Sequence, residues 1–350
     1  MRVFKYRGGD DKVFSRDLSS LEQDYFWSPN YGNLNDPCEG LVLTDQVFEQ
    51  LNVLNNVFGN AEQTSFISLD SVKEAFRDLI AIKDKSGIYS LSKTFTDELL
   101  WAHYANSHYG FCIEYDLDKL CDFESTKYSI FDVIYQNKPP VMNFDSMFAS
   151  ENQNKTLQKL TSVKSKRWQY EEEIRIITPS EGKQYYDFRA VKSIYFGLRM
   201  EKKKIRLIME TLQGRGIKYF QMQLKANSYE LTHQSIDDLY PTKQKYKYSI
   251  SPIDEYTIDV QSLDEKWSKY KSYLFKLAEI ARREPYCQEV TMVALDTTQS
   301  TIDNPIFFAQ LKRKEYRHKN IYLTINEIDD IFALIDDLDE NYAASILKLN

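Results

Sequence analysis

The sequence contains few of the residues that build disulfide frameworks, metal sites or flexible low-complexity segments. Four cysteines and four histidines are spread over 350 residues, and neither type recurs at the short spacings of zinc sites or paired thiols. Glycine and proline number only 11 and 9, which argues against disordered and fibrous classes of protein. The composition therefore predicts a folded chain without a structural metal or a disulfide framework.

Long hydrophobic runs and an excess of positive charge are also missing. No uninterrupted apolar stretch approaches the roughly 18 residues of a membrane span, and residues 1–8 are too polar for a signal peptide. The formal net charge of -7 gives no support to nucleic-acid binding over the whole surface, although it allows a local basic groove. We expect a cytoplasmic protein without a membrane partner.

Apolar residues make up 42% of the chain and aromatic residues 14%, which is sufficient for a large core. The length allows two domains, and a change to polar, lysine-rich sequence near residue 240 predicts the boundary between them. We therefore expect one domain over residues 1–240 and an accessory, partner-binding region over residues 241–350. Hydrophobic periodicity predicts that this second region is mainly helical, with helices over 260–283, 304–317 and 324–347.

The first 240 residues alternate between patterns typical of strands and of helices. The fold class expected from this alternation is α+β, with a mixed, mostly antiparallel β-sheet and flanking helices. Strands are predicted over 2–6, 25–29, 88–92, 111–116, 173–177, 190–197 and 216–222, and helical patterns over 44–84, 144–167 and 201–212, with a separate helix at 69–82. A capping box is predicted at Asp36 and Glu39.

The most unusual stretch is Trp168–Pro179, in which three glutamates precede β-branched residues. If it forms a strand, Glu171, Glu173 and Arg175 share one face, because alternate side chains of a strand point the same way. Neighbouring like charges cost energy unless a cation or a function offsets them. One interpretation is an edge strand on which Arg175 neutralises its neighbours; the other is that Glu173 is a catalytic carboxylate and Glu171 its positioning partner.

Two other segments carry side chains suited to a ligand. Arg7 ends the first strand beside Gly8-Gly9, where it could reach an anionic ligand or simply face solvent. Ser90 and Ser92 face the same way at the end of a strand. His103 and His108 fall within an aromatic helical stripe, which favours a structural role for both.

Four stretches together resemble a large bacterial domain family of unknown function. They are Tyr6-Arg7, Asn35-Asp36-Pro37, Leu100-Trp101-Ala102-His103-Tyr104 with His108-Tyr109-Gly110, and Trp168 with Tyr170–Arg175. The resemblance covers roughly residues 1–225. By itself it implies no activity.

A second resemblance does imply one. An arginine on the first strand, a Ser-x-Ser strand and a Glu-x-Glu before an aliphatic strand look like the Arg–Ser–Glu pattern of ADP-ribosyltransferases. The resemblance implies a split β-sheet of the ADP-ribosyltransferase type and NAD as cofactor. By position in the motifs it implies Glu173, Glu171 and Ser92 as catalytic residues, and Arg7, Tyr6, Ser90, Ser92 and Tyr104 as NAD-binding residues.

The chemistry of that family gives each residue type a role. Glu173 would stabilise the positive charge that develops on the ribose when nicotinamide leaves. Glu171 would orient or deprotonate the acceptor, and Arg7 would hold the diphosphate. Ser92 would brace the nicotinamide ribose.

The expected function is therefore NAD-dependent ADP-ribosylation of RNA or protein by a toxin or anti-phage effector. An antitoxin or chaperone could bind the C-terminal region. Interleaved tyrosines and lysines at 243–248, with basic segments near Lys164 and Arg313, favour a nucleic-acid acceptor. Two alternatives stay open: a metal-dependent hydrolase or nuclease that uses Glu171 and Glu173, and a non-catalytic interaction module of a toxin–antitoxin system.

Overall fold

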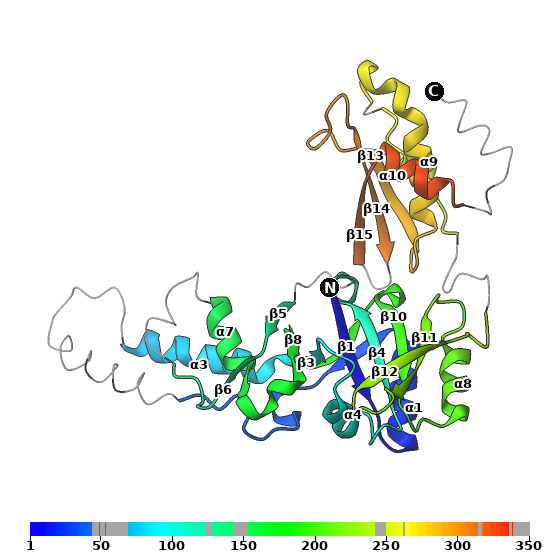
Figure 1. The fold of residues 1–350 in the computed structure, drawn as a ribbon. Helices are drawn as coiled ribbons and strands as arrows, with labels where there is room; N and C mark the ends of the chain where they lie inside the picture. Colours follow the sequence, from blue (N-terminus) through cyan, green and yellow to red (C-terminus); the bar gives the residue numbers. More distant parts are fainter. Residues whose placement is uncertain are drawn as a thin grey trace, which may run out of the picture. The chain divides into compact units, whose positions relative to one another are not determined.

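The computed structural model describes residues 1–43, 49, 53, 69–123, 128–142, 153–241, 250–261, 263–313, 317–335 and 338. The chain divides into two compact units, Met1–Pro241 and Thr242–Asn350 (Figure 1). Each unit has its own hydrophobic core. In the described part of the chain, no helix is both long and apolar enough to cross a membrane.

The first unit is built on a mixed, mostly antiparallel sheet, which confirms the expected α+β class. Within the described residues, eight strands lie in the order β12-β11-β10-β4-β1-β3-β8-β5, and only β10 and β11 run parallel (Figure 1). In chain order they are β1 (Arg2–Arg7), β3 (Gly87–Ser92), β4 (Phe111–Asp116), β5 (Ser129–Asp132), β8 (Glu173–Thr178), β10 (Val191–Phe196), β11 (Lys218–Leu224) and β12 (Leu231–Ile236).

The sheet opens between β1 and β3. β1 pairs with β4 along its whole length, from Arg2 to Arg7, but it pairs with β3 only at Phe4 and Ser92. The hydrogen-bonded ladder is therefore interrupted near the centre of the sheet. Side chains of β1 and β3 can line a cavity there.

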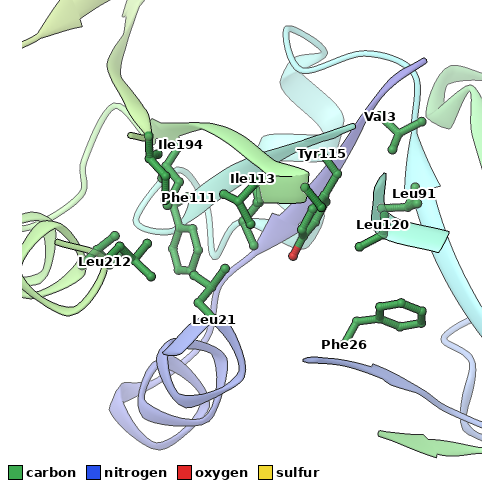
Figure 2. Packing of buried hydrophobic residues seen from close by; sticks show 14 of the residues in the cluster. Val3, Leu21, Phe26, Leu91, Phe111, Ile113, Tyr115, Leu120, Ile194 and Leu212 are labelled. Carbon is green, nitrogen blue, oxygen red and sulfur yellow. The ribbon is translucent and has the colours of Figure 1, made fainter. Parts of the chain in front are cut away.

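Both faces of the sheet are covered because its strands alternate two sets of apolar side chains. Val3 and Ile113 face α1 (Asp11–Glu22) and α8 (Lys202–Thr211), whereas Phe4 and Tyr6 pack with α4 (Glu98–Tyr104). Figure 2 shows Leu21 of α1 pointing toward Phe111 of β4 in the first of these cores.

Smaller elements surround the sheet. The pair β2 (Tyr25–Ser28) and β9 (Gly182–Tyr185) is antiparallel, and the pair β6 (Ile134–Gln136) and β7 (Val163–Ser165) is parallel. The remaining described elements of this unit are η1 (Tyr31–Asn33), α3 (Leu69–Lys85), α5 (Leu117–Cys121), α7 (Gln153–Thr161), η3 (Lys166–Glu171) and η4 (Phe188–Ala190). The helix predicted over 69–82 is confirmed as α3.

Two local predictions near the glutamate-rich stretch are wrong. In the described part of the helix predicted over 144–167, residues 153–161 form α7, but Val163–Ser165 form a strand, with Val163 and Lys164 buried in the β6–β7 pair. Residues 144–152 of this prediction lie outside the described residues. Glu171 does not extend the strand: it ends the 3-10 helix η3, and Glu172 turns the chain with a φ of 43° before β8 begins.

The capping box predicted at Asp36 and Glu39 is also wrong. The Asp36 side chain accepts from the backbone N–H of Cys38 in a turn, not at the start of a helix. The Glu39 side chain instead forms ion pairs with two buried cations. A local sequence pattern does not report such long-range ion pairs.

The described residues of the second unit form a sheet as well as helices, and the sheet was not predicted. Its three-stranded antiparallel sheet consists of β13 (Glu289–Leu295), β14 (Ile306–Arg313) and β15 (Arg317–Thr324), accompanied by η5 (Glu255–Thr257), η6 (Glu265–Tyr270), α9 (Lys271–Arg282) and α10 (Ile325–Phe332). Of the helix expected over 304–317, Ile306–Arg313 form the strand β14 instead, because Phe307, Ala309 and Leu311 are buried at a period of two. The Thr324/Glu327 capping box at the start of α10 is confirmed.

Some predictions lie wholly or partly outside the described residues. They are the helical pattern over 44–68, the lysine–tyrosine segment 243–248 and the end of the helix predicted over 324–347.

Candidate functional site

A cavity of about 680 Å³ opens where β1 and β3 separate. Its walls include residues 4–7 of β1 and 88–92 of β3, together with side chains from α1, α4, β2, β7 and η3. Its volume is in the range of small-molecule sites. All the site residues expected from the sequence line this one cavity: Tyr6, Arg7, Ser90, Ser92, Tyr104, Glu171 and Glu173.

Strand pairing positions Glu173. In the antiparallel β3–β8 pair, Ser92 lies opposite Glu173 and Ser90 lies opposite Arg175. The backbone N–H of Glu173 donates to the Tyr135 hydroxyl at 2.8 Å. The serine strand and the glutamate strand are therefore direct neighbours, although about 80 residues separate them in sequence.

The Glu173 carboxylate is buried but ionised. Its Oε1 accepts from Arg175 Nε at 2.8 Å, and its Oε2 lies 3.3 Å from Lys164 Nζ. Burial alone would raise the pKa of Glu173, but the charges of Arg175 and Lys164 hold that pKa at about 2. A fixed negative charge thus lines the cavity at neutral pH.

Glu171 has the opposite electrostatic character. Its Oε1 accepts from the Tyr104 hydroxyl at 2.6 Å, and its Oε2 accepts from Lys164 Nζ at 2.6 Å. Burial raises the pKa of Glu171 above its usual value; Lys164 lowers it in part, and the neighbouring Glu173 raises it further. Two carboxyl groups in one cavity therefore have pKa values displaced in opposite directions, as is typical of acid–base sites.

Ser92 supports the backbone next to these carboxylates. Its hydroxyl donates to the carbonyl oxygen of Glu171 at 2.7 Å and accepts from the backbone N–H of Thr94 at 3.1 Å. The only proton of the hydroxyl is therefore used within the protein. This geometry gives Ser92 a positioning role, and its contact with a ribose stays a prediction.

Two further residues complete a buried ion cluster. Glu39 pairs with Arg175 and also lies 3.1 Å from Lys164, and all three side chains are nearly inaccessible to solvent. With Glu171 and Glu173, the cluster contains three carboxylates and two cations. One negative charge stays unneutralised beside the cavity when all five groups are ionised.

Sequence reasoning missed Glu39 and Lys164. Glu39 matched a capping box, and Lys164 was assigned to a basic segment near the site without a role of its own. The burial of Lys164 follows from its place in the parallel β6–β7 pair. Local sequence patterns contain no signal for such a long-range pairing.

A second part of the cavity is cationic. The Arg7 guanidinium lies 3.4 Å from the Tyr89 hydroxyl and 3.8 Å from Asp17 Oδ1, and its buried Nε has no hydrogen-bond partner among the described residues. Lys5, two residues before Arg7, also lines the cavity. The sequence reasoning proposed Arg7 but not Lys5 or Asp17.

Aromatic side chains form much of the remaining wall. Trp27 of β2 lines the cavity although its side chain is 52% exposed, so it lies at the open side. The neighbouring Tyr25 ring has the Lys183 ammonium 4.4 Å from its centroid. The sequence reasoning assigned neither Trp27 nor Tyr25 to the site. An exposed indole next to a cation is suited to stacking on a flat ring.

Tyr6 and His108 belong to the packing around the site. The Tyr6 hydroxyl donates to the carbonyl oxygen of Thr94 at 3.1 Å, and its ring packs edge-on against Trp101. The His108 ring stacks with the Trp101 ring, and their centroids are 6.1 Å apart. Among the described residues, no group of three His, Cys, Asp or Glu side chains could hold a metal ion.

Comparison with known proteins supports one of the two resemblances in part. Residues 100–176 match a family of unknown function, DUF2971. The match includes Tyr104, Glu171 and Glu173 but not Arg7 or Ser92, and it covers less than a quarter of the chain. No curated protein and no solved structure matches. The comparisons show no likeness to ADP-ribosyltransferases.

The hydrogen bond from Tyr104 to Glu171 gives a testable prediction. Because this bond favours the ionised carboxylate, Tyr104→Phe is expected to raise the pKa of Glu171 further. A hydrogen bond to a charged group contributes about 1.5–3 kcal/mol, which corresponds to roughly one to two pH units. An NMR titration of the Glu171 carboxyl group should show this increase in pKa. An unchanged titration of Glu171 with reduced thermal stability would assign Tyr104 a structural role only.

Proposed function

We propose that the protein is an NAD-dependent ADP-ribosyltransferase whose first unit has the split-sheet fold of that class. One observation carries the proposal: an ionised Glu173, a Glu171 of raised pKa and the Arg7 guanidinium line the same cavity. The interruption of the ladder between β1 and β3 agrees with the split sheet. The cavity volume suits a dinucleotide held partly in the open.

The carboxylates match the needs of glycosyl transfer. When the bond between the ribose C1′ and the nicotinamide nitrogen breaks, the electron pair leaves with nicotinamide and positive charge develops on the sugar. Glu173 stays charged at neutral pH, so it stabilises that positive charge without a proton transfer. The unneutralised negative charge of the surrounding cluster acts in the same direction.

Glu171 is suited to act on the acceptor. The acceptor nucleophile forms the new bond to C1′ and must lose a proton. A carboxylate of raised pKa is a better base than an ordinary one, and Tyr104 and Lys164 fix its orientation. Arg7 would bind the diphosphate through charge-assisted hydrogen bonds. Its Nε is available for one of them, because it has no hydrogen-bond partner in the part of the chain that the structure describes.

The proposed acceptor of the ADP-ribose group is RNA or protein. Modification of either would suit a cytoplasmic toxin or anti-phage effector, and the C-terminal unit would then bind a partner such as an antitoxin or chaperone. Trp27 and Lys183 at the open side of the cavity favour an acceptor with a flat ring, as in RNA.

Ligand-dependent stability distinguishes this proposal from the alternatives. A protein that binds NAD is stabilised by about 2.7 kcal/mol at a concentration one hundred times the Kd. We expect NAD to raise the melting temperature and free nicotinamide to accumulate on incubation with cellular RNA or protein. Stabilisation by Mg²⁺ with RNA cleavage would instead support a nuclease. No response to either ligand would support an interaction module.

A further inference from the structure

We infer that Lys5 and Arg7 together form a two-cation subsite for the diphosphate of a nucleotide diester. The assignment of this diphosphate to NAD rests on the proposed function; the subsite itself does not. Lys5 thereby becomes a binding residue that recognises the most highly charged part of the ligand.

The geometry of β1 brings the two cations together. Residues two apart on a strand point to the same face, and both side chains line the cavity. Both also lie over the Tyr89 ring: the Lys5 ammonium is 4.8 Å and the Arg7 guanidinium carbon 5.9 Å from its centroid. Two positive charges therefore share one aromatic wall.

The protein supplies little negative charge to this pair. The Lys5 ammonium donates to the backbone carbonyl oxygen of Ser90 at 2.7 Å, and no carboxylate among the described residues is within ion-pair distance of it. Asp17 is 3.8 Å from Arg7 but closer to Arg16, at 3.0 Å. Neighbouring like charges in a partly desolvated site are costly unless an anion joins them.

The charge of Lys5 depends on its surroundings. Burial and then the charge of Arg7 lower the pKa of Lys5 to about 7, and the charges of Glu173, Asp17 and Glu171 only partly oppose them. The other group facing the amine is the Tyr89 ring, whose hydroxyl is neutral because burial raises its pKa. A bound diphosphate favours the charged amine, so the complex takes up a proton above pH 7.

The sign of the pH dependence follows. Below pH 7, Lys5 is already charged and affinity is highest. Above pH 7, each bound diphosphate must also recruit a proton, so affinity falls by up to tenfold per pH unit. An arginine at position 5 stays charged throughout and removes this dependence.

ADP-ribose is the probe, because its diphosphate diester has no proton that titrates near neutrality. Isothermal titration of the full chain at pH 6.5 and 8.5, in buffers of different ionisation enthalpy, measures affinity and proton uptake together. We expect about 25-fold weaker binding at pH 8.5 than at pH 6.5, with close to one proton taken up at pH 8.5. Lys5→Arg should bind equally at both pH values without uptake, and Lys5→Met should bind at least tenfold more weakly at pH 6.5.

A matched control is Lys83, which also bonds to a backbone carbonyl, lies 4.4 Å from a tyrosine ring centroid and is outside the cavity lining. Lys83→Met should bind ADP-ribose like the unaltered protein. Adenosine should bind weakly at all pH values, and UDP-glucose tests whether the diphosphate alone is recognised or the adenine as well. The melting temperature of each variant verifies folding.

Wild-type affinity in a folded Lys5→Met variant, or the absence of proton uptake at pH 8.5, overturns the subsite. The proposed function can fail separately. ADP-ribose binding with proton uptake but without NAD consumption would retain the subsite and refute the transferase. NAD consumption that does not depend on Lys5 would retain the transferase and refute the subsite.

Discussion

Replacing Glu173 by glutamine is expected to lower the rate of nicotinamide release by about 10²–10³-fold, because a single preorganised electrostatic group contributes that much to a transition state. The substitution keeps the size of the side chain and removes the negative charge beside the ribose. NAD affinity should change much less than the rate, because the diphosphate is proposed to bind Lys5 and Arg7 and not Glu173. A rate within threefold of the wild-type rate would show that Glu173 does not stabilise the developing cation.

The neighbouring Glu172 is the matched control for this substitution. It is exposed and lies at a turn with a φ of 43°. Glu172→Gln makes the same chemical change one residue away, so it should leave the rate of nicotinamide release unchanged. Equal losses in both variants would indicate a general effect of charge or folding and not a catalytic role.

Replacing Arg175 by methionine is expected to have the largest effect on stability. Arg175 is 1% exposed, and it donates to Glu173, Glu39 and the carbonyl oxygen of Thr161. Its removal leaves two buried carboxylates without their main partner, which costs about 3–5 kcal/mol. Urea denaturation should show this loss as a lower free energy of unfolding.

Two further variants separate this loss from a generic effect of removing a cation. Adding Glu39→Gln to Arg175→Met should restore part of the stability, since one of the unpaired carboxylates is then neutral. Lys225→Met removes an exposed ion pair with Glu230 and should leave the unfolding midpoint unchanged. A loss of less than 1 kcal/mol on removal of Arg175 would contradict a tightly coupled cluster.

The pKa of Glu173 also determines how stability changes in acid. Because its folded-state pKa is depressed from 4.5 to about 2, the ionised carboxylate stabilises the fold fully above pH 4.5. This contribution is lost as the pH falls from 4.5 through 2. We expect a steep loss of stability in this window for the wild type and a shallower one for Glu173→Gln, measured by urea denaturation at each pH.

The sequence was sufficient to predict the strands that carry the site. Ser90, Ser92 and Glu173 were placed on strands by β-branched composition and alternation, and these strands pair directly. Arg7 was found from its position at a strand end beside two glycines. Local patterns report such features because they depend on nearest neighbours along the chain.

Features that depend on distant pairing could not be predicted in this way. Lys164 is buried because β7 pairs in parallel with β6, and Glu39 leaves a turn to reach Arg175, which is 136 residues away. Lys5 has the sequence pattern of an ordinary polar residue in an alternating strand. It lines the cavity because β1 and β3 pair only at Phe4 and Ser92. In the second unit, residues 304–317 matched a helical pattern, but tertiary packing selected a period of two.

The most direct test of the account is the crystal structure of the Glu173→Gln variant with NAD bound. We expect the nicotinamide ribose beside the glutamine side chain and the diphosphate against Lys5 and Arg7. Both parts of the dinucleotide should lie in the cavity between β1 and β3. NAD bound elsewhere, or bound with its diphosphate away from Arg7, would contradict it.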